Sequence, residues 1–313
     1  MPVPRATARL TTDRPEPDMD PRIRHRLRCP ICALPLAEAT AGTTQTLACP
    51  RRHSFDVARQ GYVNLLAGRT PHVGDTSEMV AARADFLAAG HYDLISRALA
   101  GAAAVAAARH RAAHPQPGAS AAAYPLVVEP GAGTGRHLAA VLAALPDAVG
   151  LALDVSKPAL RRAARAHDRA GAALADTWQQ LPLPDESVAV LLNVFAPRNG
   201  AEFHRVLDPA GALLVVTPAA DHLTELVGAL GLLRVDPAKP DRVAGHLGKR
   251  FATESETEHR TRLTLTRPEI AALVGMGPSA WHTDPDGLTE RIAALPEPVE
   301  VTVAVRLGVH GRR

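Results

Sequence analysis

The sequence predicts an α/β protein with a mostly parallel, Rossmann-like sheet, preceded by a small N-terminal module. Three observations support this. From residue 124 onward, apolar runs of strand length alternate with Ala- and Leu-rich helical segments, as in proteins with parallel sheets. A glycine-rich turn, Gly131 to Gly135, joins the first of these strands to a helix. Three cysteines and a histidine gather between residues 29 and 53, in a segment too short to form a stable core alone.

The composition is that of an ordinary globular chain. Of 313 residues, 46% are hydrophobic and 21% charged, but only 3% are aromatic, so the core must consist mainly of Ala, Leu and Val. The formal net charge is +3, and nearly all cations are arginine, the better bidentate partner for phosphate, although a biased base composition would also favour arginine. No apolar run is long enough to span a bilayer, and Met1 to Arg28 lacks the hydrophobic centre of a signal peptide, so we expect a cytoplasmic protein.

Residues 1–27 are predicted to be a disordered basic arm. They contain five prolines and no apolar periodicity, and arginines accumulate toward their end. Two interpretations stay open: a solvated tail without function, or an arm that contacts the backbone of a nucleic acid.

Residues 28–66 are predicted to form a zinc-binding module for RNA recognition. Cys29 and Cys32 make a C-x2-C pair, and Cys49 and His53 follow sixteen residues later as C-x3-H. Four nitrogen and sulfur donors match a closed, tetrahedral, structural zinc site. A redox C-x-x-C pair would not need Cys49 and His53, and unliganded thiols are the remaining alternative.

Basic and aromatic residues alternate directly after this cluster, which would suit phosphates and stacked bases: Arg51, Arg52, Phe55, Arg59 and Tyr62. The alternative is that the two aromatic residues form the core of the module, and for Phe55 we favour that alternative.

Residues 67–123 are predicted to be a linker and helices. The turn-rich stretch 67–78 is typical of a linker. Thr76 or Ser77 would cap a helix from about Glu78 to Ala89, and a second helix would run to about Ala108. The Pro-, Gly- and Ala-rich stretch 112–123 would be a connector.

Residues 124–313 are predicted to form the domain that binds a methyl-donor cofactor, as in a methyltransferase, and the glycine loop is its first indication. Val127 to Glu129 is a predicted strand, and the helix from His137 to Leu145 follows Gly131, Gly133 and Gly135. Glycines allow close approach of the backbone to a ligand, and nicotinamide and flavin enzymes also use such loops. The G-x-G-x-G spacing and Glu129 favour S-adenosylmethionine, because a carboxylate there would repel a pyrophosphate but suits a cationic amine.

Further candidates follow the next strands. Asp154 ends the strand Val149 to Leu153, where an acid holds ribose hydroxyls in doubly wound folds. A helix from Ser156 to Ala170 leads to the strand Ala173 to Ala175, and Asp176 would lie near an adenine ring. After the strand Val188 to Leu192, the candidates for the wall of a base pocket are Asn193, Phe195 and Pro197. Phe195 could equally stack on a base or pack in the core.

The rest of the chain completes the predicted sheet. A helix over Gly200 to Leu207 leads to the strand Ala212 to Val216, and another helix covers Leu223 to Leu230. Segments 263–265 and 299–306 are predicted antiparallel strands at the sheet edge.

The whole pattern resembles the bacterial 23S ribosomal RNA guanine-N1 methyltransferases, the family that includes the tylosin-resistance methyltransferase of actinobacteria. The resemblance covers nearly everything from Arg28 onward. It rests on these landmarks: Cys29-Pro-x-Cys32, Cys49-Pro-x-x-His53-x-Phe55-Asp56, Gly61-Tyr-Val-Asn-Leu-Leu66, Gly74-Asp-Thr-x-Glu-Met79, Ala82-Arg-x-x-Phe86-Leu-x-x-Gly-His-Tyr92, Phe195-Ala-Pro197 and Met276-Gly-Pro-Ser-Ala-Trp281.

The resemblance implies a class I S-adenosylmethionine-dependent methyltransferase fold, an N-terminal zinc module that helps to grip 23S ribosomal RNA, and a homodimer. It also implies cofactor contacts at Tyr92, Gly135, Arg136, His137 and His222. The implied reaction methylates N1 of guanine 745 or guanine 748 in one hairpin loop. The use of arginine in place of lysine and the richness in alanine and proline suggest an actinobacterial-like genome and so favour guanine 748, with macrolide resistance as a consequence if a second methylation is also present. The long arm before Arg28 and the short linker around Arg69 to Gly74 depart from the family pattern.

Guanine N1 lies on the Watson–Crick edge, so the base must be unpaired to react. No side chain stands out as the general base. The competing hypotheses are a methyltransferase of a small molecule or a protein, a non-catalytic RNA-binding protein that keeps a cofactor pocket and, less favoured, a nicotinamide oxidoreductase.

Overall fold

The computed structural model describes residues 19–41, 44–68, 70–115, 124–232, 245, 247–277 and 285–313. The helices are α1 Pro21–Arg24, α2 Ser77–Ala88, α3 Asp93–Ala113, α4 Arg136–Ala144, α5 Lys157–Ala163, α6 Gly200–Val206, α7 Thr224–Leu230, η2 Gly248–Arg250, α9 Arg267–Gly275 and α10 Pro285–Ala293. The strands are β1 Ala37–Ala41, β2 Thr44–Ala48, β3 Ser54–Asp56, β4 Tyr62–Asn64, β5 Leu126–Pro130, β6 Val149–Asp154, β7 Ala170–Leu174, β8 Val188–Val194, β9 Leu207–Pro218, β10 Phe251–Leu265 and β11 Val299–Arg312.

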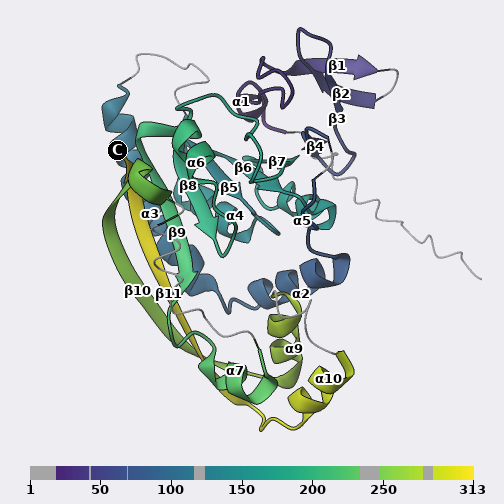
Figure 1. Ribbon diagram of the computed structural model, residues 1–313, viewed down its shortest axis with the longest axis vertical. Coiled ribbons are helices and arrows are strands. Elements are labelled where there is room, and N and C mark those ends of the chain that lie inside the picture. Colours follow the sequence, from purple (N-terminus) through teal and green to yellow (C-terminus); the bar gives the residue numbers. More distant parts are fainter. Residues whose placement is uncertain are drawn as a thin grey trace, which may run out of the picture.

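The main sheet has the order β10-β11-β9-β8-β5-β6-β7-β4 (Figure 1). The pairs from β9 to β4 are parallel, whereas β11 is antiparallel to both β9 and β10, which confirms the predicted antiparallel edge. Strand β5 lies between β6 and β8, so the chain order reverses there. In open α/β sheets, ligands bind beside the carboxyl ends of the strands at such a switch point. The glycine loop follows β5 and therefore occupies that position.

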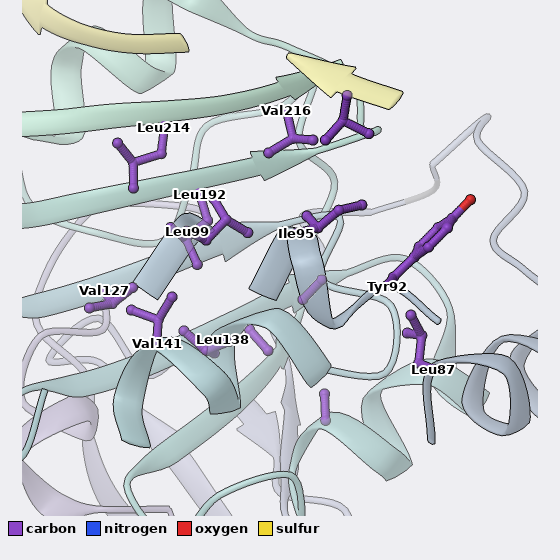
Figure 2. Close-up of a cluster of buried hydrophobic side chains, with 14 of the residues drawn as sticks. Leu87, Tyr92, Ile95, Leu99, Val127, Leu138, Val141, Leu192, Leu214 and Val216 are labelled. Atoms are coloured by element: carbon purple, nitrogen blue, oxygen red, sulfur yellow. The ribbon is translucent and has the colours of Figure 1, made fainter. Parts of the chain in front are cut away.

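Two apolar clusters cover the two faces of the sheet. Along β5, Val127 belongs to the cluster that α3 and α4 cover, and its neighbours Leu126 and Val128 belong to the other. This alternation follows from the two-residue period of a strand. Figure 2 shows the first cluster, in which Leu99, Leu138 and Leu192 come from three different elements. With so few aromatic residues, aliphatic side chains provide most of this packing, as the composition predicts.

The N-terminal module is a three-stranded antiparallel sheet of order β1-β2-β3 at one end of the molecule (Figure 1). Its buried side chains, including Leu36, Leu47 and Phe55, belong to the same apolar cluster as Val128 of the main sheet. Phe55 is therefore a core residue, as expected. Strand β4, at the end of the predicted module, pairs with β7 of the main sheet. The module thus shares core and hydrogen bonds with the rest of the chain.

The predicted disorder of residues 1–27 is wrong for its last part, and residues 1–18 lie outside the described residues. Helix α1 starts at Pro21, capped by Asp20, whose carboxylate accepts a hydrogen bond from the backbone N–H of Arg22. Met19, Ile23 and Leu27 are buried. Ile23 lies on the helix, Met19 precedes it and Leu27 follows it, so the regular spacing of four residues continues beyond the helix. The prolines and arginines around these residues outweighed that signal. A short apolar stripe folds here because the sheet offers a surface to cover it.

The arginines of this segment bind the protein itself. Arg22 pairs with Asp20 and lies 4.6 Å from the ring centre of Tyr124, and Arg24 pairs with Glu38. Arg26 donates to the carbonyl of Tyr124 at 2.6 Å. These contacts tie the segment around α1 to Tyr124, which precedes β5, and to β1 of the N-terminal module.

Other boundaries differ modestly from expectation. Thr76 caps α2, as one of the two predicted caps. Helix α3 runs to Ala113, five residues past the predicted end, and α5 ends at Ala163, well before the predicted Ala170. Strand β7 begins at Ala170, three residues earlier than predicted. Among the described helices, none is long and apolar enough to cross a membrane.

Candidate functional site

Cys29, Cys32, Cys49 and His53 converge in the N-terminal module, with all four ligand atoms within 4.8 Å of one another. The Nδ1 atom of His53 lies 3.4 Å from both the Cys29 and Cys49 sulfurs, and the Cys32 and Cys49 sulfurs are 3.6 Å apart. For Zn–S bonds of about 2.3 Å and Zn–N bonds of about 2.0–2.1 Å, the edges of a tetrahedron are roughly 3.7 Å and 3.6 Å. The four predicted ligands therefore fit a zinc ion.

A cavity of about 910 Å³ lies beside the carboxyl ends of β5, β6 and β8. It gathers residues from the glycine loop, the ends of several strands, the linker before α2, and α9. Nine predicted cofactor residues line it: Tyr92, Glu129, Gly131, Gly133, Arg136, His137, Asp154, Asp176 and His222. The predicted base-pocket residues Phe195 and Pro197 line the same cavity.

The glycine loop needs its glycines for two different reasons. Gly131 has φ +73°, and a Cβ atom there would lie 2.7 Å from the Cβ of Ala196, too close for any side chain. Gly135 has φ +75° and does not line the cavity; a Cβ there would approach Ala163 of α5 at 3.0 Å. Gly135 thus allows α4 to pack closely against α5, whereas Gly131 brings the backbone to the cavity.

Asp154 holds the glycine loop. One carboxylate oxygen accepts from the Gly133 N–H at 2.8 Å, and the other accepts from the Ser156 N–H, also at 2.8 Å. Burial raises the pKa of Asp154, and these two hydrogen bonds oppose that rise. A carboxylate oxygen can accept more than one hydrogen bond, so Asp154 can also receive ribose hydroxyls.

Two buried groups on either side of the glycine loop, Glu129 on β5 and His137 on α4, have strongly shifted pKa values. Burial raises the pKa of Glu129 to about 8, and its carboxylate accepts from the Leu138 N–H at 3.1 Å. Burial lowers the pKa of His137 to about 4, and its Nδ1 atom lies 2.9 Å from the Ser96 hydroxyl. Near neutral pH His137 is uncharged. Glu129 is the acid beside the cavity whose ionisation a nearby cationic amine would favour.

Tyr92, Phe195 and His222 form an aromatic wall of the cavity. Their ring centres are 5.9–6.3 Å apart. Burial raises the pKa of Tyr92 far above its usual range, so the phenol stays neutral. Figure 2 shows Tyr92 at the start of α3, with its hydroxyl turned away from the aliphatic cluster. Phe195 is 40% exposed and has φ +51°, an uncommon conformation for a non-glycine residue. Its exposure contradicts packing in the core.

Asn193 does not line the cavity. It is fully buried, and its Nδ2 atom donates to the Pro197 carbonyl at 2.9 Å. This hydrogen bond spans the turn that carries Phe195, so Asn193 braces that turn from the protein interior.

Comparisons with known proteins agree with this geometry. Residues 27–70 match the family model of the RlmA N-terminal zinc ribbon. A relative from Micromonospora griseorubida, assigned by name to the 23S rRNA (guanine-N(1)-)-methyltransferases, is 67% identical over 291 residues, which are 92% of this chain and 98% of the relative. The 23S rRNA (guanine(748)-N(1))-methyltransferase of Streptomyces fradiae is 52% identical over 283 residues, which are 90% of this chain and 95% of that protein.

The chain belongs to the 23S rRNA (guanine-N1)-methyltransferase family. A third relative, YxjB from Bacillus subtilis, is 29% identical over 291 residues, 90% of this chain and 95% of that protein. The fold is that of an S-adenosylmethionine-dependent methyltransferase with an N-terminal zinc module, as the sequence predicts. S-adenosylmethionine and zinc are therefore its two cofactors.

The linker before α2 also contributes to the cavity of this methyltransferase, which its turn-rich sequence did not indicate. Residues 71–75 line the cavity. The His72 ring and the Thr70 hydroxyl contact one carboxylate oxygen of Asp176 at 2.8 Å and 2.6 Å. These contacts lower the pKa of Asp176 against the effect of burial. The linker thus covers the end of the cavity at which adenine was expected.

Arg83 and Trp178 were also missed as site residues. Arg83 pairs with Asp75 of the linker and donates to the Met276 carbonyl at 2.7 Å, so it joins the linker to the end of α9. Trp178 is 46% exposed, lines the cavity, and lies 6.4 Å from the His72 ring. The family landmarks Gly74 to Met79 and Ala82 to Tyr92 include Asp75 and Arg83 and could have indicated them. Trp178 had only its position after Asp176 as a signal.

Proposed function

We propose that this methyltransferase transfers a methyl group from S-adenosylmethionine to N1 of guanine 748 in 23S ribosomal RNA. One observation carries the proposal: a single cavity joins the cofactor loop to the exposed ring of Phe195. The similarity to the Streptomyces fradiae guanine(748) enzyme, 52% identity over 90% of this chain, favours guanine 748 over guanine 745.

The cofactor would lie along the cavity. Asp154 would accept the ribose hydroxyls, and Asp176, with Trp178 beside it, would meet the adenine end. Glu129 would face the cationic amine, while Gly131 and Gly133 would let the backbone approach. Tyr92, Arg136, His137 and His222 complete the wall around the methionine end. S-adenosylmethionine supplies an electrophilic methyl group, so the protein mainly has to position two reactants.

The guanine base would enter beside Phe195. Because N1 pairs in a duplex, the base must be unpaired, and an exposed aromatic ring can stack on it. Phe195 and Pro197 lie on the turn that Asn193 braces, so the stacking surface is held in place. The strained φ of Phe195 is consistent with a turn shaped for contact with a ligand.

The zinc module would grip the RNA around the reacting base. Arg51, Arg52 and Arg59 are exposed on it and can contact phosphates. Residues 71–75 of the linker that follows this module line the cavity, so the linker would connect RNA bound to the module with the site. The family resemblance further supports a homodimer acting in the cytoplasm, and light scattering of the purified protein tests the dimer.

Primer extension on 23S RNA treated with the protein and S-adenosylmethionine tests the substrate. N1 methylation blocks Watson–Crick pairing, so reverse transcriptase should stop one nucleotide before guanine 748. An RNA with adenine at that position is the matched control and should give no stop. A stop at guanine 745 contradicts the choice of guanine. No stop anywhere in the hairpin, despite cofactor binding, contradicts the substrate and would favour a small-molecule or protein methyltransferase.

A further inference from the structure

A second cluster of metal-binding side chains lies at the far end of α3. His110 and His114 are four residues apart at the C-terminal end of this helix, and Asp208 lies near the start of β9. Tyr92 stands at the other end of the same helix. Since a helix rises about 1.5 Å per residue, its 21 residues place the cluster roughly 30 Å from that wall of the cofactor cavity. The cluster is therefore separate from the catalytic site.

The three ligand atoms have the spacing of a metal site. The Nε2 atoms of His110 and His114 lie 3.7 Å and 3.3 Å from the same oxygen of Asp208, and all three atoms lie within 4.8 Å of one another. The two rings are stacked, with centres 4.6 Å apart. Zinc bonds of about 2.0–2.1 Å to nitrogen and oxygen give tetrahedral edges of roughly 3.3–3.4 Å. Both measured distances are close to this value.

The hydrogen bonding of His114 indicates that a cation belongs between these groups. Its Nδ1 atom lies 3.0 Å from the backbone carbonyl of His110, which can only accept, so Nδ1 carries a hydrogen. In the neutral ring, Nε2 then holds a lone pair that faces a carboxylate oxygen. Two acceptors 3.3 Å apart need a proton or a metal ion between them. A backbone carbonyl on the other ring nitrogen is also the usual way to orient a metal-bound histidine.

The remaining contacts leave the cluster free to bind. Asp208 uses its other oxygen to accept from the Ala210 N–H at 2.8 Å, so the shared oxygen stays available. The Nδ1 atom of His110 is buried without a hydrogen-bond partner among the described residues. The polar contact of this ring is therefore made by Nε2, which faces Asp208. The side chain of His114 is 43% exposed, so water can reach the site and supply a fourth ligand.

We propose that His110, His114 and Asp208 bind a divalent metal ion, for which zinc is the favoured candidate, and that water completes the coordination. Two imidazoles and one carboxylate suit such ions. The bound metal would cross-link the end of α3 to the start of β9 and act structurally.

Metal analysis of the full-length protein, with its cysteine site loaded, tests the proposal. After equilibration with micromolar zinc sulfate and gel filtration, the wild-type protein should hold two zinc ions per chain, and His114→Ala and Asp208→Asn should each hold one. Zinc should also raise the melting temperature of the wild-type protein above that of the one-zinc form, but not that of either variant. Asparagine keeps an acceptor for Ala210, and unchanged S-adenosylmethionine affinity would verify the fold of both variants.

His259→Ala, at a histidine on β10 outside the cluster, is the matched control and should keep two zinc ions. Cobalt added as the second equivalent should give visible bands without thiolate charge transfer. A single zinc ion in the wild-type protein would overturn the proposal and leave a protonated histidine paired with Asp208. A second ion that survives in both cluster variants would overturn it as well.

Discussion

Replacing Asp154 by alanine separates two roles of one carboxylate. In the structure, Asp154 accepts from the backbone N–H groups of Gly133 and Ser156, each at 2.8 Å. In the proposed complex it also accepts ribose hydroxyls. Asp154→Ala removes all of these hydrogen bonds. It should therefore lower the stability of the cofactor-free protein and also its affinity for S-adenosylmethionine.

The expected magnitudes follow from hydrogen bonds to a charged group, which contribute about 1.5–3 kcal/mol each. The loss of the two backbone contacts should lower the free energy of unfolding by roughly 3 kcal/mol or more. The loss of a ribose contact of about 1.4 kcal/mol or more should raise the dissociation constant of S-adenosylmethionine at least tenfold.

Calorimetric titration with S-adenosylmethionine measures the affinity, and urea unfolding of the cofactor-free protein measures the stability. Asp147→Ala, at an exposed aspartate in the loop after α4, is the matched control and should change neither. An unchanged dissociation constant in Asp154→Ala, alongside reduced stability, would refute the ribose contact and leave Asp154 only its role in the loop.

The remaining predictions concern the metal, a buried acid and the N-terminal helix. Removing zinc from the cysteine site, by chelation or in Cys49→Ala, should unfold the N-terminal module and weaken RNA binding. The reason is that a module of this size needs the metal to fold. Full zinc content in Cys49→Ala would contradict the ligand set. Burial raises the pKa of Glu129 to about 8 from an ordinary value of 4.5. At a pH between these two values, the unfolded state has released a proton that the native state keeps. The free energy of unfolding should therefore fall by about 1.4 kcal/mol for each unit by which the pH rises. Relative to Glu129→Gln, the cofactor-free wild-type protein should therefore lose roughly 2–3 kcal/mol between pH 5 and pH 7 in urea unfolding, and parallel pH profiles would argue against a buried neutral carboxyl. Ile23→Ala should cost about 2–4 kcal/mol of unfolding free energy because Ile23 is fully buried, whereas Ile31→Ala, at a 60% exposed position, should cost little; equal effects would mean that α1 does not pack as described.

The amino-acid sequence alone was enough to predict the features that depend on short stretches of chain. The spacing of Cys29, Cys32, Cys49 and His53 predicted the zinc cluster, because turns of two and three residues place such ligands together. The glycine loop after β5 and the acid after β6 predicted the cofactor cavity, because parallel strands bring their carboxyl ends to one edge. Both signals come from short stretches of chain, since Cys29 and His53 are 24 residues apart and Gly133 and Asp154 are 21 residues apart.

The contacts between segments that are distant in the chain became visible only in the folded protein. The stripe of Met19, Ile23 and Leu27 was too short to predict a helix, since isolated short helices are unstable and this one needs the sheet to cover it. The linker carried turn residues and no periodicity, yet it lines the cavity, where His72 contacts Asp176, 104 residues away. His110 and Asp208 are likewise far apart in sequence, and no local pattern encodes their contact. Such contacts depend on where α3 and the linker pack relative to β9 and the other strands of one sheet, which the order of residues along the chain does not reveal.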